Sequence, residues 1–532
     1  MLVNSSLYGA LKYSALHHTK ATSSYYLGRS YDYDQFLLMV DNFANGLHYL
    51  GIKSDDVVSV CAPNTIESIV AFYAINKLGA IAHMVHPLIS KEVLKDNLKE
   101  VNSKCLIILN LSFETYEDII KDGITTIVIN PARSLGCIAG LVYAQKNHCK
   151  SYSKYENCYS FNRLLNKKED YFDVNHNTTK TAVLLNSGGS SGKPKVIKLS
   201  SYALNSLVNE GAEILNINVK DVEGLYMLAV LPMFHGFGLV MGVHAMLMNG
   251  GAINIMPKFH RDNVIRDIKK GKINYLIGVP ALYEALLSRD EFNDDMLKNL
   301  KCCFVGGDFV APSLIEKFNA RMQENGSSAR LFEGYGLTET VTVCCVNTFN
   351  HNKANTVGKA LNCVDIKIID DNCNVLPNGE VGEIVVSGTI LMNGYLDNKN
   401  PFINIDGVQY VKTGDCGYLD EDNFLVFKQR IKRLLKVKGI NVFPSEVEKL
   451  VTNYSEVSQA CLVGVKEDTL RLYIVLNDKN GEHFDDRIRS DIEKKISVFA
   501  VPKEIVYLRK MPQTDVTKIN YKVLENYDFK EE

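Results

Sequence analysis

The chain has 532 residues and a formal net charge of -2, from 59 basic and 61 acidic side chains. This length exceeds what one hydrophobic core usually supports, so we expect at least two domains. The balanced charge, with no long block of one sign, gives no indication of binding to nucleic acid or to an anionic membrane.

The cysteines indicate a reducing compartment. The 13 cysteines include no CxxC pair, and the adjacent pairs Cys302-Cys303 and Cys344-Cys345 lie within apolar runs. Such residues are more typical of a core than of a metal site, and free thiols suit the cytoplasm. The N-terminal residues lack the basic and long apolar regions of a signal peptide, so we expect a cytoplasmic protein.

The first part of the chain alternates strand-like and helical patterns. Apolar residues recur at helical spacing over residues 33–50 and 65–78, and short apolar runs at 57–62, 81–85 and 105–109 read as buried strands. This alternation predicts a parallel sheet with helices on both faces. His83 and His86 lie near one strand end and could suggest a metal site. Two histidines without a third ligand are, however, more often structural.

One stretch, residues 182–195, stands out because a short apolar run leads into three glycines, three serines and two lysines. Glycine backbone N–H groups, hydroxyls and lysine ammonium groups together suit a polyphosphate, although an ordinary turn uses the same residue types. The spacing differs from a kinase-type Walker A loop, because three residues separate Gly188 from Gly192 and Pro194 follows Lys193.

The middle of the chain contains a long apolar run at residues 229–248. Because it includes Pro232, His235 and His244, a buried strand, loop and helix explain it better than a membrane span. We further expect helices at 202–215 and from Pro280, and strands at 274–279 and 302–305.

The character of the chain changes after about residue 356. Short strand-like runs at 364–368, 383–386 and 424–427, separated by turn residues, predict a small β-rich subdomain. Beyond Arg430, a helix start at Pro444, strands at 461–465 and 472–476, and a helix carrying Ile488, Ile492 and Ile496 predict a compact α+β domain.

Motifs along nearly the whole chain resemble, in the same order, those of the adenylate-forming (AMP-binding) superfamily, which includes acyl-CoA synthetases, firefly luciferase and the adenylation domains of peptide synthetases. The matching stretches are the phosphate loop 187–195, the acyl-pocket motif 231–238, the adenine-side Gly306-Gly307, the core motif 335–339, the ribose motif 412–415, the hinge region 430–448 and the terminal lysine motif 514–518.

The resemblance implies an α/β architecture. Residues 1–430 would form a large AMP-binding domain of stacked parallel-sheet α/β subdomains with a small β-rich subdomain. Residues 431–532 would form a small, mobile α+β lid domain.

The resemblance also implies a two-step reaction. A carboxylic acid reacts with ATP to give acyl-AMP and pyrophosphate, and CoA then takes the acyl group as a thioester. Fixed donors, a lysine and Mg²⁺ would offset the repulsion between the carboxylate and the phosphates. Two alternatives stay open: a carrier-protein pantetheine as the acceptor, and a nucleotide-binding sensor without catalysis.

The resemblance assigns each site residue a role. Glu339 would hold Mg²⁺, Thr338 would donate to phosphate, and Lys518 would bridge the carboxylate and the α-phosphate, with His235 as a further catalytic residue. The ATP-binding residues would be Ser187, Gly188, Gly189, Ser190, Ser191, Gly192 and Lys195 at the phosphates, Gly306, Gly307, Tyr335 and Gly336 at the adenine, and Asp415 with Arg430 at the ribose.

The expected acyl pocket contains Phe234, His235, Gly236 and Phe237. Adenylation domains for amino acids typically carry Asp where this chain has His235, and a histidine cannot supply that negative charge to an α-ammonium group. This argues for a simple carboxylic acid. The apolar surroundings favour a medium- or long-chain fatty acid, with an aryl acid as second choice.

For the second step, the resemblance implies a hinge at Lys432 and a thiol tunnel beside Lys438 and Gly439. Three positions depart from the family pattern: Gly188 stands where Ser or Thr is usual, and Val196 and Thr517 stand where glycine is usual. Hydroxyl donors remain next to Gly188, and we expect an active enzyme.

Overall fold

The computed structural model describes residues 2–146, 154–167, 177–187, 195–216, 221–438, 440–466, 469–478, 483–512 and 519–526. They belong to two compact units, the first made of residues 1–366 and 386–411 and the second of residues 367–385 and 412–532. Three strands contribute residues to both units: β17 (Val364–Ile369), β18 (Gly382–Gly388) and β21 (Val408–Leu419).

The first sheet of unit 1 is mainly parallel, as the alternating pattern predicts. β3 pairs in parallel with β4 and β5, β4 with β8, and only the β8–β9 and β9–β19 pairs within its described strands are antiparallel. The order is β19 (Gly394–Tyr395), β9 (Val196–Ser200), β8 (Thr181–Asn186), β4 (Ile81–Met84), β3 (Val57–Cys61), β5 (Ser103–Leu109), β6 (Thr125–Ile129) and β7 (Cys158–Ser160).

The second sheet of unit 1 carries three of the expected motifs at one edge. β10, β12, β13 and β14 are parallel neighbours, so the loops that follow them leave the same edge of the sheet. The order is β16 (Lys359–Ala360), β15 (Cys345–Val346), β14 (Leu331–Tyr335), β13 (Cys302–Val305), β12 (Tyr275–Gly278), β10 (Tyr226–Ala229), β11 (Ala252–Ile255), β1 (Thr22–Tyr26) and β2 (Arg29–Asp32).

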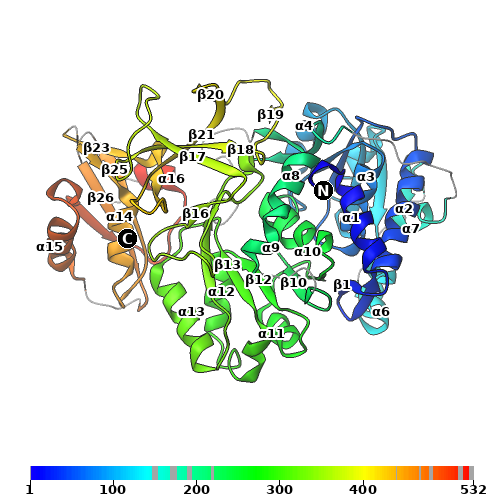
Figure 1. The fold of residues 1–532 in the computed structure, drawn as a ribbon, viewed down its shortest axis with the longest axis horizontal. Coiled ribbons are helices and arrows are strands. Elements are labelled where there is room, and N and C mark those ends of the chain that lie inside the picture. Colours follow the sequence, from blue (N-terminus) through cyan, green and yellow to red (C-terminus); the bar gives the residue numbers. More distant parts are fainter. Residues whose placement is uncertain are drawn as a thin grey trace. The chain divides into compact units, whose positions relative to one another are not determined.

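Helices cover these sheets with their apolar sides. Val264, Leu286 and Phe318 come from three successive helices and share one core with Leu276 of β12. These helices are α11 (Arg261–Lys269), α12 (Pro280–Leu287) and α13 (Pro312–Glu324) (Figure 1). Leu94 and Ile120 of α4 (Lys91–Glu100) and α5 (Glu117–Lys121) pack in the same way on the first sheet.

The N-terminal helices surround α3 (Ile66–Lys77), in which every residue is buried. Thr65 caps its start, and the helix packs against α1 (Leu7–His17) and α2 (Tyr33–Tyr49). The remaining described α-helices of unit 1 are α6 (Cys137–Lys146), α7 (Phe161–Leu164), α8 (Ser201–Asn209), α9 (Gly211–Ile214) and α10 (Ala245–Met248).

In the middle of the chain, residues 202–215 and 229–248 form the following elements. The helix expected over 202–215 is divided into α8 and α9, and the division lies beside Gly211, a residue that costs a helix interior about 1 kcal/mol relative to alanine. The apolar run 229–248 forms the end of β10, a turn, a π-helix (Phe237–His244) and α10, which confirms the strand, loop and helix. Among the described residues, no helix has the length and apolar character needed to span a bilayer.

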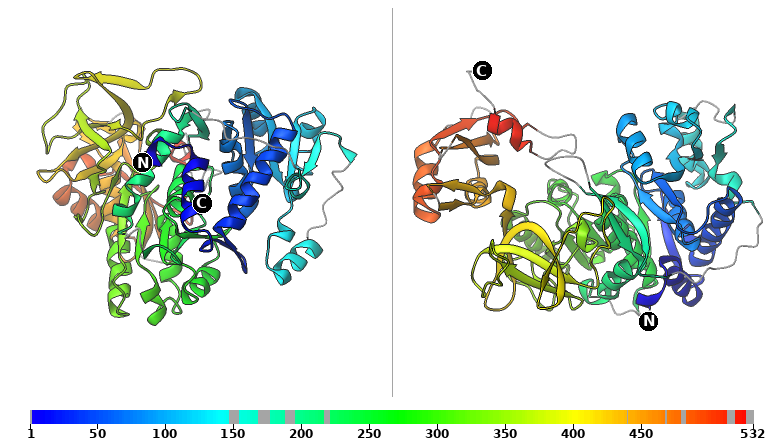
Figure 2. Two further views of the ribbon diagram at one scale, coloured as in Figure 1. Left: turned by 45° about the vertical axis from the view of Figure 1, so that its right-hand side comes forward. Right: turned by 90° about the horizontal axis from the view of Figure 1, so that it is seen from above.

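Unit 2 contains a small sheet with both faces covered. Leu462, Leu472 and Ile474 face a core built with α14 (Pro444–Thr452) and α15 (Asp485–Lys495), whereas the alternate residues Cys461 and Tyr473 face α16 (Tyr521–Asn526), coloured red in Figure 2. The sheet order is β25 (Val457–Lys466), β26 (Thr469–Leu476) and β27 (Glu504–Tyr507). The predicted α+β character of this region is confirmed.

The β-rich character of the region before it is also confirmed. In unit 1, β20 (Phe402–Ile405) pairs with the first half of β21, and in unit 2 the second half of β21 pairs with β22 (Leu425–Arg430). A short hairpin of β23 (Leu435–Val437) and β24 (Ile440–Val442) follows.

Candidate active site

The two described ends of the glycine- and serine-rich loop are joined at its base. Ser187 N donates to the carbonyl oxygen of Lys195 at 2.8 Å, and Lys195 N donates to Ser187 Oγ at 3.0 Å. The antiparallel pairing of β8 with β9 continues from this closure. The predicted phosphate ligands between these ends, Gly188, Gly189, Ser190, Ser191 and Gly192, lie outside the described residues.

The core motif forms a tight turn at the end of β14. A short 3₁₀ helix, Thr338–Thr340, is held by Thr340 Oγ1, which donates to the carbonyl oxygen of Leu337 at 3.0 Å. The next residue, Val341, has φ 63° and ψ -60°, and Thr342 N donates across it to the carbonyl oxygen of Thr340. This γ-turn is rare and strained for a β-branched residue, which indicates that the surrounding packing holds it in place.

The acyl-pocket motif packs directly against this turn through Gly236. A Cβ on residue 236 would lie 1.9 Å from the carbonyl oxygen of Val341, so only glycine fits without movement. Asn64, which is buried, holds the other end of the motif: its Nδ2 donates to the carbonyl oxygens of Ala229 and Leu231, and its Oδ1 accepts from Met233 N. Two stretches that are separate in sequence are thereby fixed next to each other.

Three neighbouring rings, from His86, Phe234 and His235, lie at the acyl-pocket motif. The ring centroid of Phe234 lies 4.5 Å from that of His86 and 4.5 Å from that of His235. Burial lowers the pKa of His86, so its neutral form is favoured. Gly236 is buried, Phe234 and Phe237 are half-buried, and His235 is exposed, which leaves one edge of the ring group open to solvent.

Glu339 is half-buried and is oriented by Tyr395, which lies outside the expected motifs. Tyr395 Oη donates to Glu339 Oε1 at 2.9 Å. The Lys195 ammonium lies 4.2 Å from the centroid of the same tyrosine ring. Carboxylate oxygens are ligands that a hard cation prefers, so the partly exposed Glu339 side chain fits the expected Mg²⁺.

The adenine-side glycines follow β13 directly. A Cβ on Gly306 would lie 2.8 Å from the carbonyl oxygen of Gly334, and Gly307 has φ +79°, a conformation that favours glycine. These two requirements keep the backbone close to the end of β14. Tyr335 and Gly336 stand at that end, and a Cβ on Gly336 would lie 1.6 Å from the carbonyl oxygen of Thr342.

The expected ribose residues form a pair within unit 2. Asp415 and Arg430 are opposite each other in the β21–β22 ladder, and Arg430 Nε lies 3.0 Å from Asp415 Oδ1. Asp415 is 2% exposed, whereas the Arg430 side chain is 62% exposed. Within β21, Gly414 has φ +69°, and Thr413 Oγ1 accepts from Asp415 N at 3.0 Å, which fixes the backbone on the N-terminal side of the carboxylate.

The expected hinge and tunnel residues also lie in unit 2. Lys432 is exposed within a 3₁₀ turn, Ile431–Arg433, and Lys438 has φ +50° at the end of β23. Gly439 and Lys518 lie outside the described residues.

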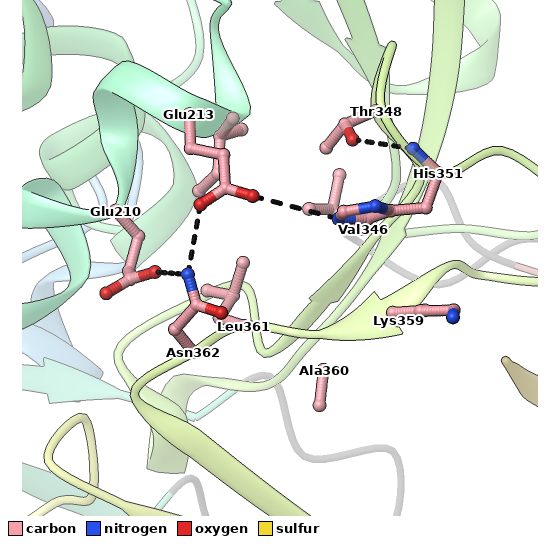
Figure 3. A pocket seen from close by; sticks show the side chains of 10 residues that line it. Glu210, Glu213, Val346, Thr348, His351, Lys359, Ala360, Leu361 and Asn362 are labelled. Atoms are coloured by element: carbon pink, nitrogen blue, oxygen red, sulfur yellow. Dashed lines mark hydrogen bonds and ion pairs between the residues drawn. The ribbon is translucent and has the colours of Figure 1, made fainter. Parts of the chain in front are cut away.

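A separate small hollow in unit 1, with a cavity volume of about 20 Å³, contains none of the expected site residues (Figure 3). Asn362 Nδ2 donates to Glu210 Oε2 and to Glu213 Oε2, and His351 Nε2 lies 3.8 Å from Glu213 Oε1. Its polar groups contact one another, and among the described residues no group of three or more His, Cys, Asp or Glu side chains could hold a metal ion.

Sequence reasoning missed Asn64, His86 and Tyr395 as members of this site. Asn64 belongs to none of the expected motifs, and His86 reads as structural. Tyr395 belongs to a strand of two residues, which is too short to produce a periodic pattern.

Comparison with known proteins identifies the family of this chain. The AMP-binding enzyme family matches residues 11–396, and the C-terminal domain of AMP-binding enzymes matches residues 446–518. A probable 4-coumarate–CoA ligase of Dictyostelium discoideum is 31% identical over 440 residues, which cover 80% of this chain and 77% of that protein. A long-chain-fatty-acid–CoA ligase of Bacillus subtilis is 26% identical over 539 residues, covering 97% and 94%.

The fold matches that of a solved O-succinylbenzoate CoA synthetase from Bacillus subtilis, in complex with ATP and magnesium ion. The TM-score is 0.79 at 21% identity, and the match covers 97% of this chain and 99% of that one. The predicted architecture, a large α/β domain with a β-rich part and a small α+β domain, is therefore confirmed. The chain belongs to the AMP-binding enzyme superfamily, and its relatives named above are acid–CoA ligases.

Proposed function

We propose that this protein activates a carboxylic acid with ATP and transfers the acyl group to CoA. In the first step a carboxylate oxygen attacks the α-phosphorus, the bond to the β-phosphate oxygen breaks, and pyrophosphate leaves. In the second step the CoA sulfur attacks the acyl carbon, the thiol proton is lost, and AMP leaves.

The observation that carries this proposal is the close packing of Gly236 against Val341. It joins the acyl-pocket motif to the turn that bears Thr338 and Glu339, so an acid beside Phe234 would lie close to groups suited to phosphate. Bound Mg²⁺ would neutralise phosphate charge and would be held by Glu339. Thr338 would donate to phosphate oxygens, and Asp415 with Arg430 would bind the ribose. Lys518 would stabilise the charge that moves between the carboxylate and the α-phosphate.

For the acid, we propose a medium- or long-chain fatty acid. The buried apolar residues of the π-helix, Leu239, Val240 and Met241, support an apolar chain, and so does the similarity to a long-chain-fatty-acid–CoA ligase. An aryl acid is the second candidate, favoured by the neighbouring rings of His86, Phe234 and His235 and by the similarity to 4-coumarate–CoA ligases.

The test is a panel of carboxylic acids, assayed for release of AMP and pyrophosphate with and without CoA. Saturated fatty acids of graded length are compared with 4-coumarate, cinnamate and an α-amino acid. We expect acid-dependent ATP–pyrophosphate exchange without CoA, and acyl-CoA with it. ADP as the product, or no acid-dependent exchange with any acid, would contradict the proposal. Turnover with a holo-carrier protein but not with CoA would show that the acceptor is a carrier-protein pantetheine, and the proposed adenylation step would stand.

Cytoplasmic location is part of the same proposal. The cysteines whose side chains the structure describes, such as Cys61, Cys105 and Cys416, are free, as expected in a reducing compartment.

A further inference from the structure

A short backbone segment, residues 392–396, joins the core motif, which contains Glu339, to β9, the strand that follows the phosphate loop. Met392 N donates to the carbonyl oxygen of Glu339 at 2.9 Å. Four residues later, Leu396 N donates to the carbonyl oxygen of Val196 at 2.9 Å, and β19 pairs with β9 between these points. The 392–396 segment is therefore bonded at both ends, which fixes the position of Tyr395 between the two functional stretches.

The Tyr395 side chain repeats this connection. Its hydroxyl donates to Glu339 Oε1 at 2.9 Å, and the Lys195 ammonium lies 4.2 Å from its ring centroid. The tyrosine is 8% exposed, so the ring has little freedom to turn away.

The choice of donor has an electrostatic consequence. A lysine bonded directly to Glu339 would cancel the carboxylate charge and would compete with a metal ion. A tyrosine hydroxyl orients one carboxylate oxygen without adding charge, and its ring holds the Lys195 cation through its face instead. The tyrosine therefore places no positive charge beside the Glu339 carboxylate, and the lysine lies at the end of the phosphate loop.

We propose that Tyr395 is a positioning residue for nucleotide-bound metal: it orients Glu339 toward Mg²⁺ and links that carboxylate to the phosphate loop through Lys195. This inference rests on the proposed function, because it assumes that Glu339 binds the metal of Mg-ATP.

The test measures ATP binding by calorimetry to the full chain, once in Mg²⁺ and once in EDTA. In Tyr395→Phe we expect the affinity for Mg-ATP to fall about tenfold, the effect of losing one hydrogen bond to a charged group. Affinity for metal-free ATP should change less than about twofold, because the ring and its contact with Lys195 remain. Adding Tyr395→Phe to Glu339→Gln should cause no further loss in Mg²⁺.

Tyr8→Phe is a matched control. Tyr8 Oη donates to Asp41 Oδ1 at 2.7 Å, and Lys77 Nζ lies 5.0 Å from the Tyr8 ring centroid, so the same chemistry is removed from helices α1 to α3. This control should leave both affinities unchanged.

Three outcomes would overturn the inference: an equal loss in Mg²⁺ and EDTA, no loss in either, or failure of Tyr395→Phe to fold while Tyr8→Phe folds. The last would mean that the hydroxyl serves stability. If the unaltered protein binds no ATP under either condition, the proposed function itself fails, and the two failures are thereby distinguished.

Discussion

The carbonyl oxygen of Val341 occupies the space that a side chain at Gly236 would need, 1.9 Å from the position of its Cβ. The atom in the way belongs to backbone in a strained γ-turn, so it cannot move aside as a flexible side chain could. The acyl-pocket motif and the core motif therefore hold each other in position.

Gly236→Ala should displace this turn. We expect a loss of about 1–3 kcal/mol in stability, as in other overpacked sites, and at least about a tenfold fall in ATP–pyrophosphate exchange, worth about 1.4 kcal/mol. Gly211→Ala is the control, because its Cβ would have its nearest neighbour, Asn249 Nδ2, at 3.9 Å. Exchange at the normal rate in Gly236→Ala would show that the turn tolerates movement.

Asp415 should determine how the enzyme recognises the ribose. If its carboxylate accepts from the hydroxyls, the unaltered protein should prefer ATP over 2′-deoxy- and 3′-deoxy-ATP by about tenfold or more, worth about 1.4 kcal/mol. Asp415→Asn should reduce that preference to within about threefold, as competition binding would report.

Asp267→Asn is the matched control for this prediction. Asp267 is also nearly buried, and Arg266 Nε lies 3.0 Å from its Oδ1, as Arg430 Nε does from Asp415. This variant should keep the preference for ATP. A preference that survives in Asp415→Asn would remove Asp415 from ribose recognition.

Gly439 should matter for the second step alone. The resemblance assigns it to the segment beside the thiol tunnel, where a side chain would block a pantetheine arm. Gly439→Leu should keep acyl-AMP formation, measured by pyrophosphate exchange, and lose thioester formation with CoA. Lys436→Leu, an exposed position on β23, should keep both. An equal loss of both half-reactions in Gly439→Leu would contradict the tunnel assignment.

Two buried histidines should make the protein less stable in acid. Burial lowers the pKa of His83 from its ordinary value of 6.5 to about 4, and that of His244 to about 3. Because unfolded histidine binds a proton near pH 6.5 and the folded one does not, stability is full above about pH 6.5. It falls as the pH drops, by about 2 kcal/mol for His83 at pH 5.

The measurement is the thermal midpoint between pH 7.5 and 4.5. His83→Asn keeps an acceptor or donor near Ser59 Oγ, which lies 2.9 Å from His83 Nδ1, and should flatten the decline. His17→Asn, at an exposed position, should leave the slope unchanged. Identical slopes in the unaltered protein and His83→Asn would show that another group controls the acid response.

Much of the fold can be predicted from the sequence, because strands and helices in it have local patterns. The helix expected at 33–50 is α2 (Tyr33–Tyr49), and the strand expected at 302–305 is β13 (Cys302–Val305). The prediction fails where a pattern is too short or interrupted, as in β19 (Gly394–Tyr395) and at the break beside Gly211. The motif residues could also be identified, because each motif is a continuous stretch.

The sequence by itself identifies the family, and it predicts the candidate site residues: the donor-rich loop, Glu339, and Asp415 with Arg430. The tertiary structure alone decides which groups act together, such as Tyr395 with Glu339, Gly236 with Val341, and His86 with Phe234. These pairs come from segments that are distant in the chain. Gly236 and Val341 follow parallel strands of one sheet, whereas the other two pairs join residues that follow or belong to strands of two different sheets. No local pattern encodes such contacts, because they depend on the packing of whole elements against one another.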